Sequence, residues 1–201
     1  MKLGQAFYAR DDVVEISRDL IGKVLCTRIR GALTSVVITE TEAYAGAGDR
    51  ASHAFGGRRT RRTEPMFGPA GTAYVYLCYG IHHLFNVVTG AVDTPHAVLI
   101  RAGRPLAGEP LMCRRRGRVA TGGLLAGPGS LAKALGIHTR HSGTSLFDDL
   151  IWIEDQGLRI DAGAITVGPR VGVDYAGPDA ERPYRFRLLE IPSSRAPGPA
   201  N

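Results

Sequence analysis

A chain of 201 residues is long enough for one substantial hydrophobic core and short for two, so its length predicts a single domain. It contains no apolar run of membrane-spanning length and no signal segment at its start, and we expect the protein in the cytoplasm or on the nucleoid. Its three cysteines are far apart and lack Cys-x-x-Cys spacing, which argues against a disulfide framework and a cysteine-based zinc site.

The positive charge of the chain is carried mainly by arginine. The net charge is +6, and only three of the 25 basic residues are lysine. The planar guanidinium of arginine suits phosphate oxygens, so the bias indicates a polyanionic partner. An arginine cluster can be only a solvated loop, but two clusters in one small domain favour a surface that binds a nucleic-acid backbone. The clusters are Arg58, Arg59, Arg61 and Arg62, and Arg114, Arg115, Arg116 and Arg118.

The first part of the chain predicts a short helix followed by a pair of strands. Asp12 and Glu15 have the spacing of a capping box, and an apolar stripe follows until Gly22, which is typical of a short packing helix. Residues 24–29 and 35–44 have the composition of strands joined by a turn at Gly31. The sheet is therefore expected to begin here.

The second of these strands carries the first chemical signal. Side chains alternate with period two, which predicts Ile38, Glu40, Glu42 and Tyr44 on one face. That face changes from apolar to acidic to aromatic, as a pocket for a flat, electron-poor ligand requires. Solvated charges at the end of a strand are the alternative interpretation for an arbitrary strand.

A long irregular connection is predicted over residues 45–73. It contains His53 and the first arginine cluster, with Phe55, Met66 and Phe67 available to anchor it. Connections of this length in a compact domain are usually functional or disordered.

A hairpin follows, with strands at residues 74–80 and 84–88. Tyr79 falls at its tip beside Gly80, where a large ring is exposed and can act as a wedge between bases. An aromatic side chain lying over the next loop is the alternative.

The rest of the chain predicts further strands and one helix. Residues 97–101 form a short strand ending at Arg101, which needs a carboxylate or carbonyl partner if it is partly buried. A loop is predicted over residues 103–129, a helix over 130–135, and strands over 146–153, 165–173 and 184–189. One domain is expected over residues 1–191, and a disordered tail over 192–201.

These residues together fit the demands of chemistry on a base in duplex DNA. The base must be flipped into a pocket at a cost of about a few kcal/mol, and the gap must be filled. Aromatic stacking returns about 1 to 3 kcal/mol per base. A carboxylate at Glu42, neighbouring rings, a ring on a hairpin tip and loop arginines meet these demands.

Blocks spaced along nearly the whole chain resemble the alkyladenine (3-methyladenine) DNA glycosylase family. The blocks are Glu40-Thr41-Glu42-Ala43-Tyr44, His53, Met66-Phe67-Gly68-Pro69, Tyr74-Val75-Tyr76 with Tyr79-Gly80, Asn86, Leu99-Ile100-Arg101, Gly127-Pro128-Gly129-x-Leu131 and Gly168-Pro169-Arg170-Val171-Gly172-Val173. The pattern departs at Arg61, where relatives often have proline, and at the variable positions His82 and His83.

The resemblance implies a single mixed α+β domain around a curved antiparallel β-sheet with short peripheral helices, without metal or cofactor. It implies that Glu42 holds and activates the attacking water and that Arg101 helps to orient it. The partner would be double-stranded DNA containing damaged purines, bound by a monomer, with Arg58, Arg59, Arg61 and Arg62 on the DNA backbone.

The resemblance also implies how the base is bound. Tyr44 and His53 would stack on one side of the flipped base and Tyr76 on the other. Tyr79 would fill the vacated place in the duplex. Asn86 would crowd the exocyclic amine of guanine and so reject it.

The expected chemistry is hydrolysis of an N-glycosidic bond through an oxocarbenium-like sugar. A purine methylated at N3 or N7 is cationic and leaves without protonation, and electron-rich rings attract it by about 0.5 to 2 kcal/mol. We therefore rank 3-methyladenine and 7-methylpurines above hypoxanthine and ethenoadenine. Lys23 and Lys133 are not obvious pocket residues, so a monofunctional enzyme without lyase activity is expected.

Three other classes compete with this hypothesis. A non-catalytic DNA- or RNA-binding module uses arginine clusters and aromatic residues equally well. A helix-hairpin-helix glycosylase is suggested by the glycines around Pro128, but the strand-rich pattern opposes it. A metal hydrolase is the weakest, because His82-His83 and His138-x-x-His141 lack acidic or cysteine partners at ligand spacing.

Overall fold

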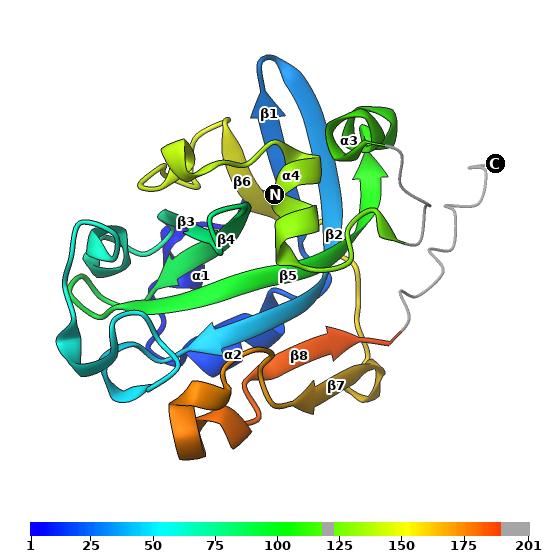
Figure 1. Cartoon of the computed structure of the whole chain (residues 1–201). Coiled ribbons are helices and arrows are strands. Elements are labelled where there is room, and N and C mark those ends of the chain that lie inside the picture. The colour runs from blue at the N-terminus through cyan, green and yellow to red at the C-terminus, as the bar shows by residue number, and fades with distance from the viewer. Residues whose placement is uncertain (118–122, 190–201) are drawn as a thin grey trace.

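The computed structural model describes residues 1–117 and 123–189, which form a mixed α+β domain around one antiparallel sheet (Figure 1). Six of the eight strands follow the order β3-β4-β5-β2-β1-β6, and of the other two, β8 pairs with β2 and β7 pairs with β8. Their bounds are Val24–Ile29 (β1), Ala32–Tyr44 (β2), Ala73–Cys78 (β3), His82–Thr89 (β4), His96–Ala107 (β5), Ile151–Glu154 (β6), Ile165–Gly168 (β7) and Arg185–Leu188 (β8). The predicted fold class is confirmed, whereas Arg118 and the expected tail over 192–201 lie outside the described residues.

Short helices surround the sheet. The α-helices are Gln5–Tyr8 (α1), Val13–Asp19 (α2), Glu109–Arg116 (α3) and Pro128–Leu135 (α4), and the 3-10 helices are Gly46–Gly48 (η1), Phe55–Gly57 (η2), Glu64–Phe67 (η3), Thr139–His141 (η5), Ala162–Ala164 (η6) and Asp174–Glu181 (η7). The side chain of Asp12 accepts hydrogen bonds from the backbone of Val14 and Glu15, as the capping pattern predicted. None of the described helices has the length and apolar character needed to cross a membrane.

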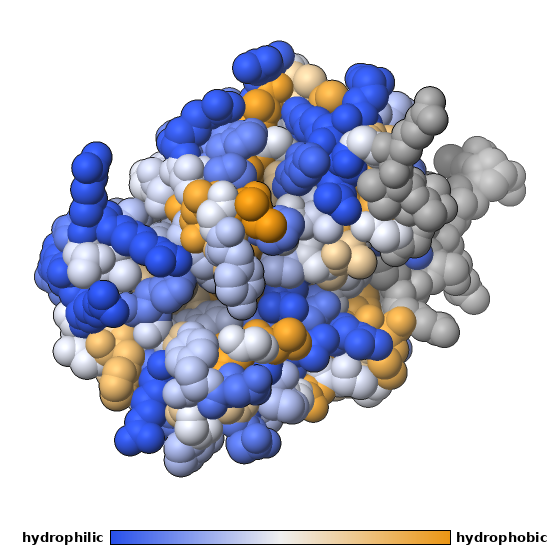
Figure 2. All heavy atoms as spheres, viewed as in Figure 1, coloured by the Kyte–Doolittle hydropathy of each residue, from blue (hydrophilic) through white to orange (hydrophobic). Residues whose placement is uncertain are grey.

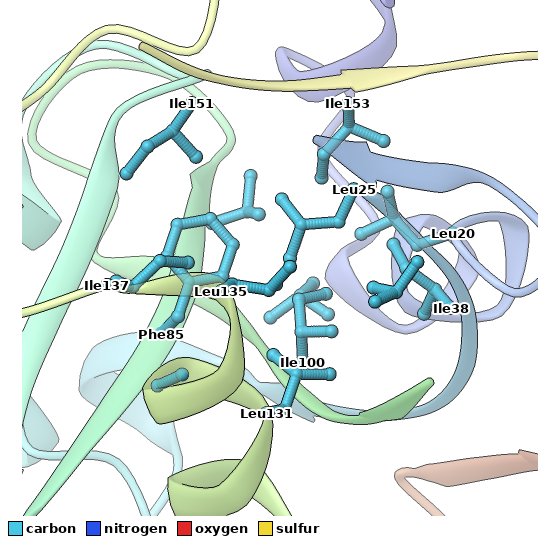
Figure 3. Close-up of a cluster of buried hydrophobic side chains, with 14 of the residues drawn as sticks. Leu20, Leu25, Ile38, Phe85, Ile100, Leu131, Leu135, Ile137, Ile151 and Ile153 are labelled. Atoms are coloured by element: carbon cyan, nitrogen blue, oxygen red, sulfur yellow. The ribbon is translucent and has the colours of Figure 1, made fainter. Parts of the chain in front are cut away.

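The main core lies between the sheet and helices α2 and α4. Leu131 and Leu135 of α4 pack against Phe85 of β4 and Ile100 of β5 (Figure 3). Each is at most 2 % exposed, so truncating one to alanine would cost about 2 to 5 kcal/mol of folding free energy. This packing fixes β4 and β5, whose opposite face lines the cavity described below.

The bounds of three predicted strands differ most from those in the structure. The strand predicted to stop at Arg101 continues to Ala107, and α3 follows, so the predicted 103–129 loop is wrong over its first half. Pro105 argued against a strand here, because proline cannot donate a backbone hydrogen bond. In the structure this part of β5 is paired on one side only, where proline is tolerated. The strand predicted over 146–153 begins at Ile151, and the one predicted over 165–173 ends at Gly168, before Pro169.

Candidate active site

An irregularity in the pairing of β2 with β5 positions the acidic residues. Between Ile38 and Glu40, β2 advances two residues while β5 advances one, and between Glu40 and Thr41 the imbalance is reversed. Thr39 and Arg101 are thus left without a cross-strand partner, one on each strand. Such bulges commonly re-aim side chains next to functional sites.

The bulge exchanges the two faces of β2. Ile38 lies in the main core, and so does Ala43, although they are an odd number of residues apart. Thr41 also faces this side, where its hydroxyl donates to the carbonyl of Ser17. The prediction that Ile38 shares a face with Glu42 is therefore wrong, because the irregular pairing turns Glu42 away from the core.

Glu42 is fully buried and held by hydrogen-bond donors from three elements. Its Oε2 accepts from Tyr44 Oη at 2.9 Å and from Arg101 Nη1 at 3.2 Å. Its Oε1 accepts from the backbone nitrogen of Val171 at 2.8 Å. An ionised carboxylate offers about four acceptor sites, so these donors leave about one free for a water molecule.

Arg101 bridges the two carboxylates of β2. Its Nε donates to Glu40 Oε1 at 2.9 Å, and Arg185 of β8 donates to the same oxygen at 2.7 Å. The prediction that Arg101 needs a carboxylate partner is confirmed. Burial, and after it the charge of Glu42, raise the pKa of Tyr44 well above its ordinary value, so this phenol remains a donor at neutral pH.

A cavity of about 460 Å³ opens next to this network, at the end of the β2–β5 pair where the cyan loop and orange η7 lie in Figure 1. Figure 2 shows hydrophilic side chains over much of the same face. The predicted base-binding residues Tyr44, His53, Tyr76 and Asn86 all line this cavity, as does Arg101. Glu42 lies behind the lining, beneath its partners Tyr44 and Arg101. The structure thus brings together residues from β2, the 45–72 connection, β3, β4 and β5.

The aromatic rings form a connected wall. His53 meets Tyr76 edge to face, with centroids 4.5 Å apart and an interplanar angle of 82°. His53 Nδ1 lies 2.9 Å from Tyr74 Oη. Burial, assisted by the charges of Arg62 and Arg58, lowers the pKa of His53 to about 4, so its imidazole is neutral at physiological pH.

Asn86 is fixed by its backbone neighbours at the floor of the cavity. It is 3 % exposed, and its Nδ2 donates to the carbonyl of Tyr74 at 3.1 Å. Its cross-strand partner is Leu99, which also lines the cavity and pairs with Glu42.

Tyr79 stands at the tip of the β3–β4 hairpin, 90 % exposed at the rim of the cavity. Its φ of 50° lies in the left-handed region, as does that of Gly80, and Ile81 donates its backbone N–H to Cys78 across the turn. A left-handed tyrosine costs about 1 kcal/mol or more, which is typical of functional sites. Ile81 is 71 % exposed beside it, a second apolar tip residue that no sequence pattern had indicated.

The first arginine cluster divides into two kinds of side chain. Arg58, Arg61 and Arg62 are exposed, and none of them forms an ion pair among the described residues. The guanidinium carbon of Arg62 lies 5.0 Å from the centroid of Tyr76, inside the cavity. Arg59 instead forms ion pairs with Glu64 and Asp93, which tie the 45–72 connection to the β4–β5 turn.

The second arginine cluster contributes to the fold. Arg115 donates to the carbonyl of Ala134, and Arg116 donates to that of Leu124, which attaches α3 to α4 and its preceding segment. Burial lowers the pKa of Arg115. These two side chains therefore contribute to the fold, and the interpretation of the cluster as a DNA-binding surface stays a prediction.

A buried ion pair supports the site from behind and had not been identified in the sequence. Arg170 and Asp49 are both fully buried at their side chains, and Arg170 Nη2 donates to Asp49 Oδ1 at 2.9 Å. The guanidinium carbon of Arg170 lies 4.9 Å from the centroid of Tyr44, and the next residue is Val171, whose N–H reaches Glu42. The block around Arg170 was part of the resemblance, but its partner 121 residues away could not be inferred.

No metal site competes with this arrangement in the described part of the chain. Among residues 1–117 and 123–189, no group of three or more His, Cys, Asp or Glu side chains could hold a metal ion.

Comparison with known proteins identifies the relatives of this chain. Residues 6–192 match the family described as methylpurine-DNA glycosylase. A protein of Anaeromyxobacter sp. strain Fw109-5, provisionally named 3-methyladenine DNA glycosylase, is 50% identical over 200 residues, which cover 98% of this chain and 95% of the relative. Two proteins with the same provisional name are similar: one from Chlamydia felis is 44% identical over 96% of this chain and 98% of its own length, and one from Bacillus cereus strain Q1 is 42% identical over 92% and 95%.

Proposed function

The chain belongs to the methylpurine-DNA glycosylase family and is a DNA glycosylase, and we propose that it releases alkylated purines from duplex DNA by hydrolysis of the N-glycosidic bond. Its substrates are 3-methyladenine and 7-methylpurines, and its product is an abasic site in an uncut strand. The single observation that carries the proposal is Glu42, a buried carboxylate with one acceptor site left, placed behind an aromatic cavity.

Glu42 prepares the attacking water. Tyr44, Arg101 and Val171 N–H fix the carboxylate, so its remaining acceptor position points in one direction. A water bound there gives a proton to Glu42 as its oxygen attacks the anomeric carbon, and the electron pair of the glycosidic bond leaves with the purine. The guanidinium of Arg101 holds the water beside Glu42.

The leaving group needs no acid when it is already cationic. Among the cavity residues, His53 is the type most often used as a general acid, and with its pKa lowered to about 4 it carries no extra proton at neutral pH. The site therefore favours purines alkylated at N3 or N7 over neutral lesions. Electron-rich Tyr44 and Tyr76 add a cation–π attraction of about 0.5 to 2 kcal/mol for such bases.

Arg62 connects DNA binding to base binding. In the free protein its guanidinium covers the face of Tyr76 on which the base is to stack. A phosphate near the cavity draws Arg62 away and uncovers the ring. Arg58 and Arg61 bind neighbouring phosphates, and Tyr79 fills the gap that the flipped nucleotide leaves.

The test is base release from duplexes that each carry one defined lesion, with hot-alkali cleavage of the abasic product and gel analysis. Wild-type protein is expected to release 3-methyladenine and 7-methylguanine, and to cut no strand before alkali treatment. Glu42→Gln is expected to bind the lesion duplex and release nothing. Release by Glu42→Gln at the wild-type rate overturns the assignment of the base, and no release by wild-type protein from any lesion favours a non-catalytic binding module.

We place the working protein in the cytoplasm, as a monomer associated with the nucleoid. Its net charge of +6 supports retention on DNA at physiological salt.

A further inference from the structure

A cluster of imidazoles lies on the side of the β3–β4 hairpin that faces away from the cavity. This histidine patch consists of His83, His138, His141 and Arg140. The rings of His83 and His138 are 4.8 Å apart between centroids, and those of His138 and His141 are 6.1 Å apart. Arg140 is exposed and extends the patch, with its Nε 3.3 Å from His141 Nε2.

The alternation of β4 sets the patch opposite the base-binding cavity. Leu84 and Asn86 line the cavity, whereas Phe85 lies in the main core under α4. His83 shares the face of Phe85. It is tied to η5 by the backbone N–H of Thr139, which donates to His83 Nδ1 at 3.2 Å.

The patch has more hydrogen-bond donors than acceptors. His83 Nδ1 accepts from the backbone N–H of Thr139, and His141 Nδ1 accepts from the backbone N–H of His138. The N–H groups of His138 and Arg140 are directed at the two ring nitrogens of His141, and a neutral imidazole has only one acceptor nitrogen, so one of these N–H groups lacks an acceptor. Solvent or a bound anion can supply this acceptor.

The charges around the patch are of one sign. None of the ion pairs found over residues 1–117 and 123–189 involves Arg140. The groups that act on His138 are His83, Arg140, Arg115 and Arg30, and after burial they lower its pKa. Burial followed by Arg140, His138 and His83 does the same to His141. No carboxylate appears among these neighbours, so none of them would compete with an anion for the N–H groups.

We propose that the histidine patch binds backbone phosphates of the DNA strand opposite the damaged nucleotide. The proposal rests on the proposed function, in which Tyr79 enters the duplex at the hairpin tip and the cavity face of the hairpin receives the flipped base. Its reverse face then meets the other strand. Phosphate oxygens only accept hydrogen bonds, which suits the surplus N–H groups, and such contacts fix the register of a protein on a duplex.

The first test is the salt dependence of duplex binding. The variants are Arg140→Ala and His138→Ala, both exposed, and the matched control is Arg159→Ala, an exposed arginine between β6 and β7. The probe is a duplex with one tetrahydrofuran abasic analogue, titrated by fluorescence anisotropy from 50 to 200 mM salt. Each phosphate contact contributes about 0.9 to the slope of log K against log salt, so Arg140→Ala is expected to lower it by about 1. The control is expected to keep the wild-type slope.

The second test identifies which DNA strand contacts the histidine patch. Neutral methylphosphonates are placed at single phosphates of either strand near the analogue. In wild-type protein, substitution at one or two positions opposite the lesion is expected to weaken binding several-fold, and an Arg140→Ala, His138→Ala double variant is expected to be insensitive there. Equal sensitivity of the two proteins, or a response confined to the damaged strand, overturns the proposal.

Base release separates this inference from the proposed function. If wild-type protein releases alkylated purines, and the patch variants have the wild-type affinity for duplex and the wild-type salt dependence, only the patch assignment fails. If wild-type protein releases no base, the proposed function fails, while the methylphosphonate series still reports which strand the patch contacts.

Discussion

Replacing Asp49 by asparagine is expected to destabilise the protein strongly and to slow base release. Asp49 and Arg170 are fully buried, and the carboxylate also accepts from the backbone N–H groups of Ala45 and Ala51. The amide keeps the volume but removes the charge and turns N–H groups toward the guanidinium. Breaking a buried ion pair on one side costs about 3 to 5 kcal/mol, because the other charge remains buried without its partner.

That free energy corresponds to a large thermal shift. In a protein of this size, 1 kcal/mol changes Tm by about 2 to 4 °C, so Asp49→Asn is expected to melt on the order of 10 °C below wild type. Thermal unfolding followed by circular dichroism measures this shift. Arg59→Ala is the matched control, because Arg59 also joins two carboxylates but is 49% exposed, and its loss is expected to move Tm far less.

The dependence of this effect on pH has a definite sign. Burial alone would raise the pKa of Asp49, but hydrogen bonds from Arg170 and the backbone outweigh it and lower the pKa from its ordinary 3.8. The carboxylate therefore contributes its full stability above pH 3.8 and loses it as pH falls through the lower folded-state value. The gap in Tm between wild type and Asp49→Asn should be constant near neutrality and close only in strong acid.

The functional part of the prediction concerns geometry. Arg170 lies against the ring of Tyr44, and the following N–H group holds Glu42. Single-turnover base release by Asp49→Asn, measured well below its Tm, should be slower than wild type by a larger factor than lesion binding is weakened. A variant that melts within 2 °C of wild type and releases base at the wild-type rate would refute the reasoning.

Three further predictions follow from single side chains. Tyr79→Ala should weaken binding to a lesion duplex by about 1 to 3 kcal/mol, or roughly 5- to 150-fold, with an unchanged Tm because the ring is 90 % exposed; unchanged anisotropy titrations would exclude the wedge. In wild-type protein the free energy of unfolding, measured in urea, should fall by up to about 3 kcal/mol between pH 6.5 and 4, because the unfolded state gains a proton on His53 that the folded state resists. His53→Gln should remove this pH dependence. Parallel pH profiles of the two proteins would contradict the lowered pKa. Asn86→Ala should allow slow release of guanine from undamaged duplex, detected as alkali-labile sites, and an unchanged background would remove Asn86 from specificity.

The sequence predicted those parts of the fold that depend on neighbours along the chain. Asp12 caps α2 because capping needs only two nearby N–H groups. The strands β1 to β4 were found from β-branched and aromatic runs between glycines. The exposed position of Tyr79 followed from its place beside Gly80 at a hairpin tip. The site residues on β2, β3, β4 and β5 were inferred from spaced blocks, and all of them except Glu42 line one cavity.

The parts that were not predicted depend on contacts across the chain. Regular alternation wrongly predicted that Ile38 shares a face with Glu42. The irregular pairing at Thr39 and Arg101 arises from the contact of β2 with β5, which the sequence of β2 alone does not show. Arg115 and Arg116 resembled a DNA-binding cluster, and only the packing of α3 on α4 shows the carbonyl groups that they bind. The Asp49–Arg170 pair joins segments with no local pattern in common.

The irregular pairing of β2 with β5 also limits which deletions this enzyme can tolerate. The two offsets cancel, so both strands return to their original phase within three residues. Loss of Thr39 would remove the offset on β2 and leave the one at Arg101 uncompensated, just where Arg101 contacts Glu40 and Glu42. A single-codon deletion at this position is therefore expected to disturb the contacts that hold both carboxylates, although every strand outside the irregular stretch would keep its pairing.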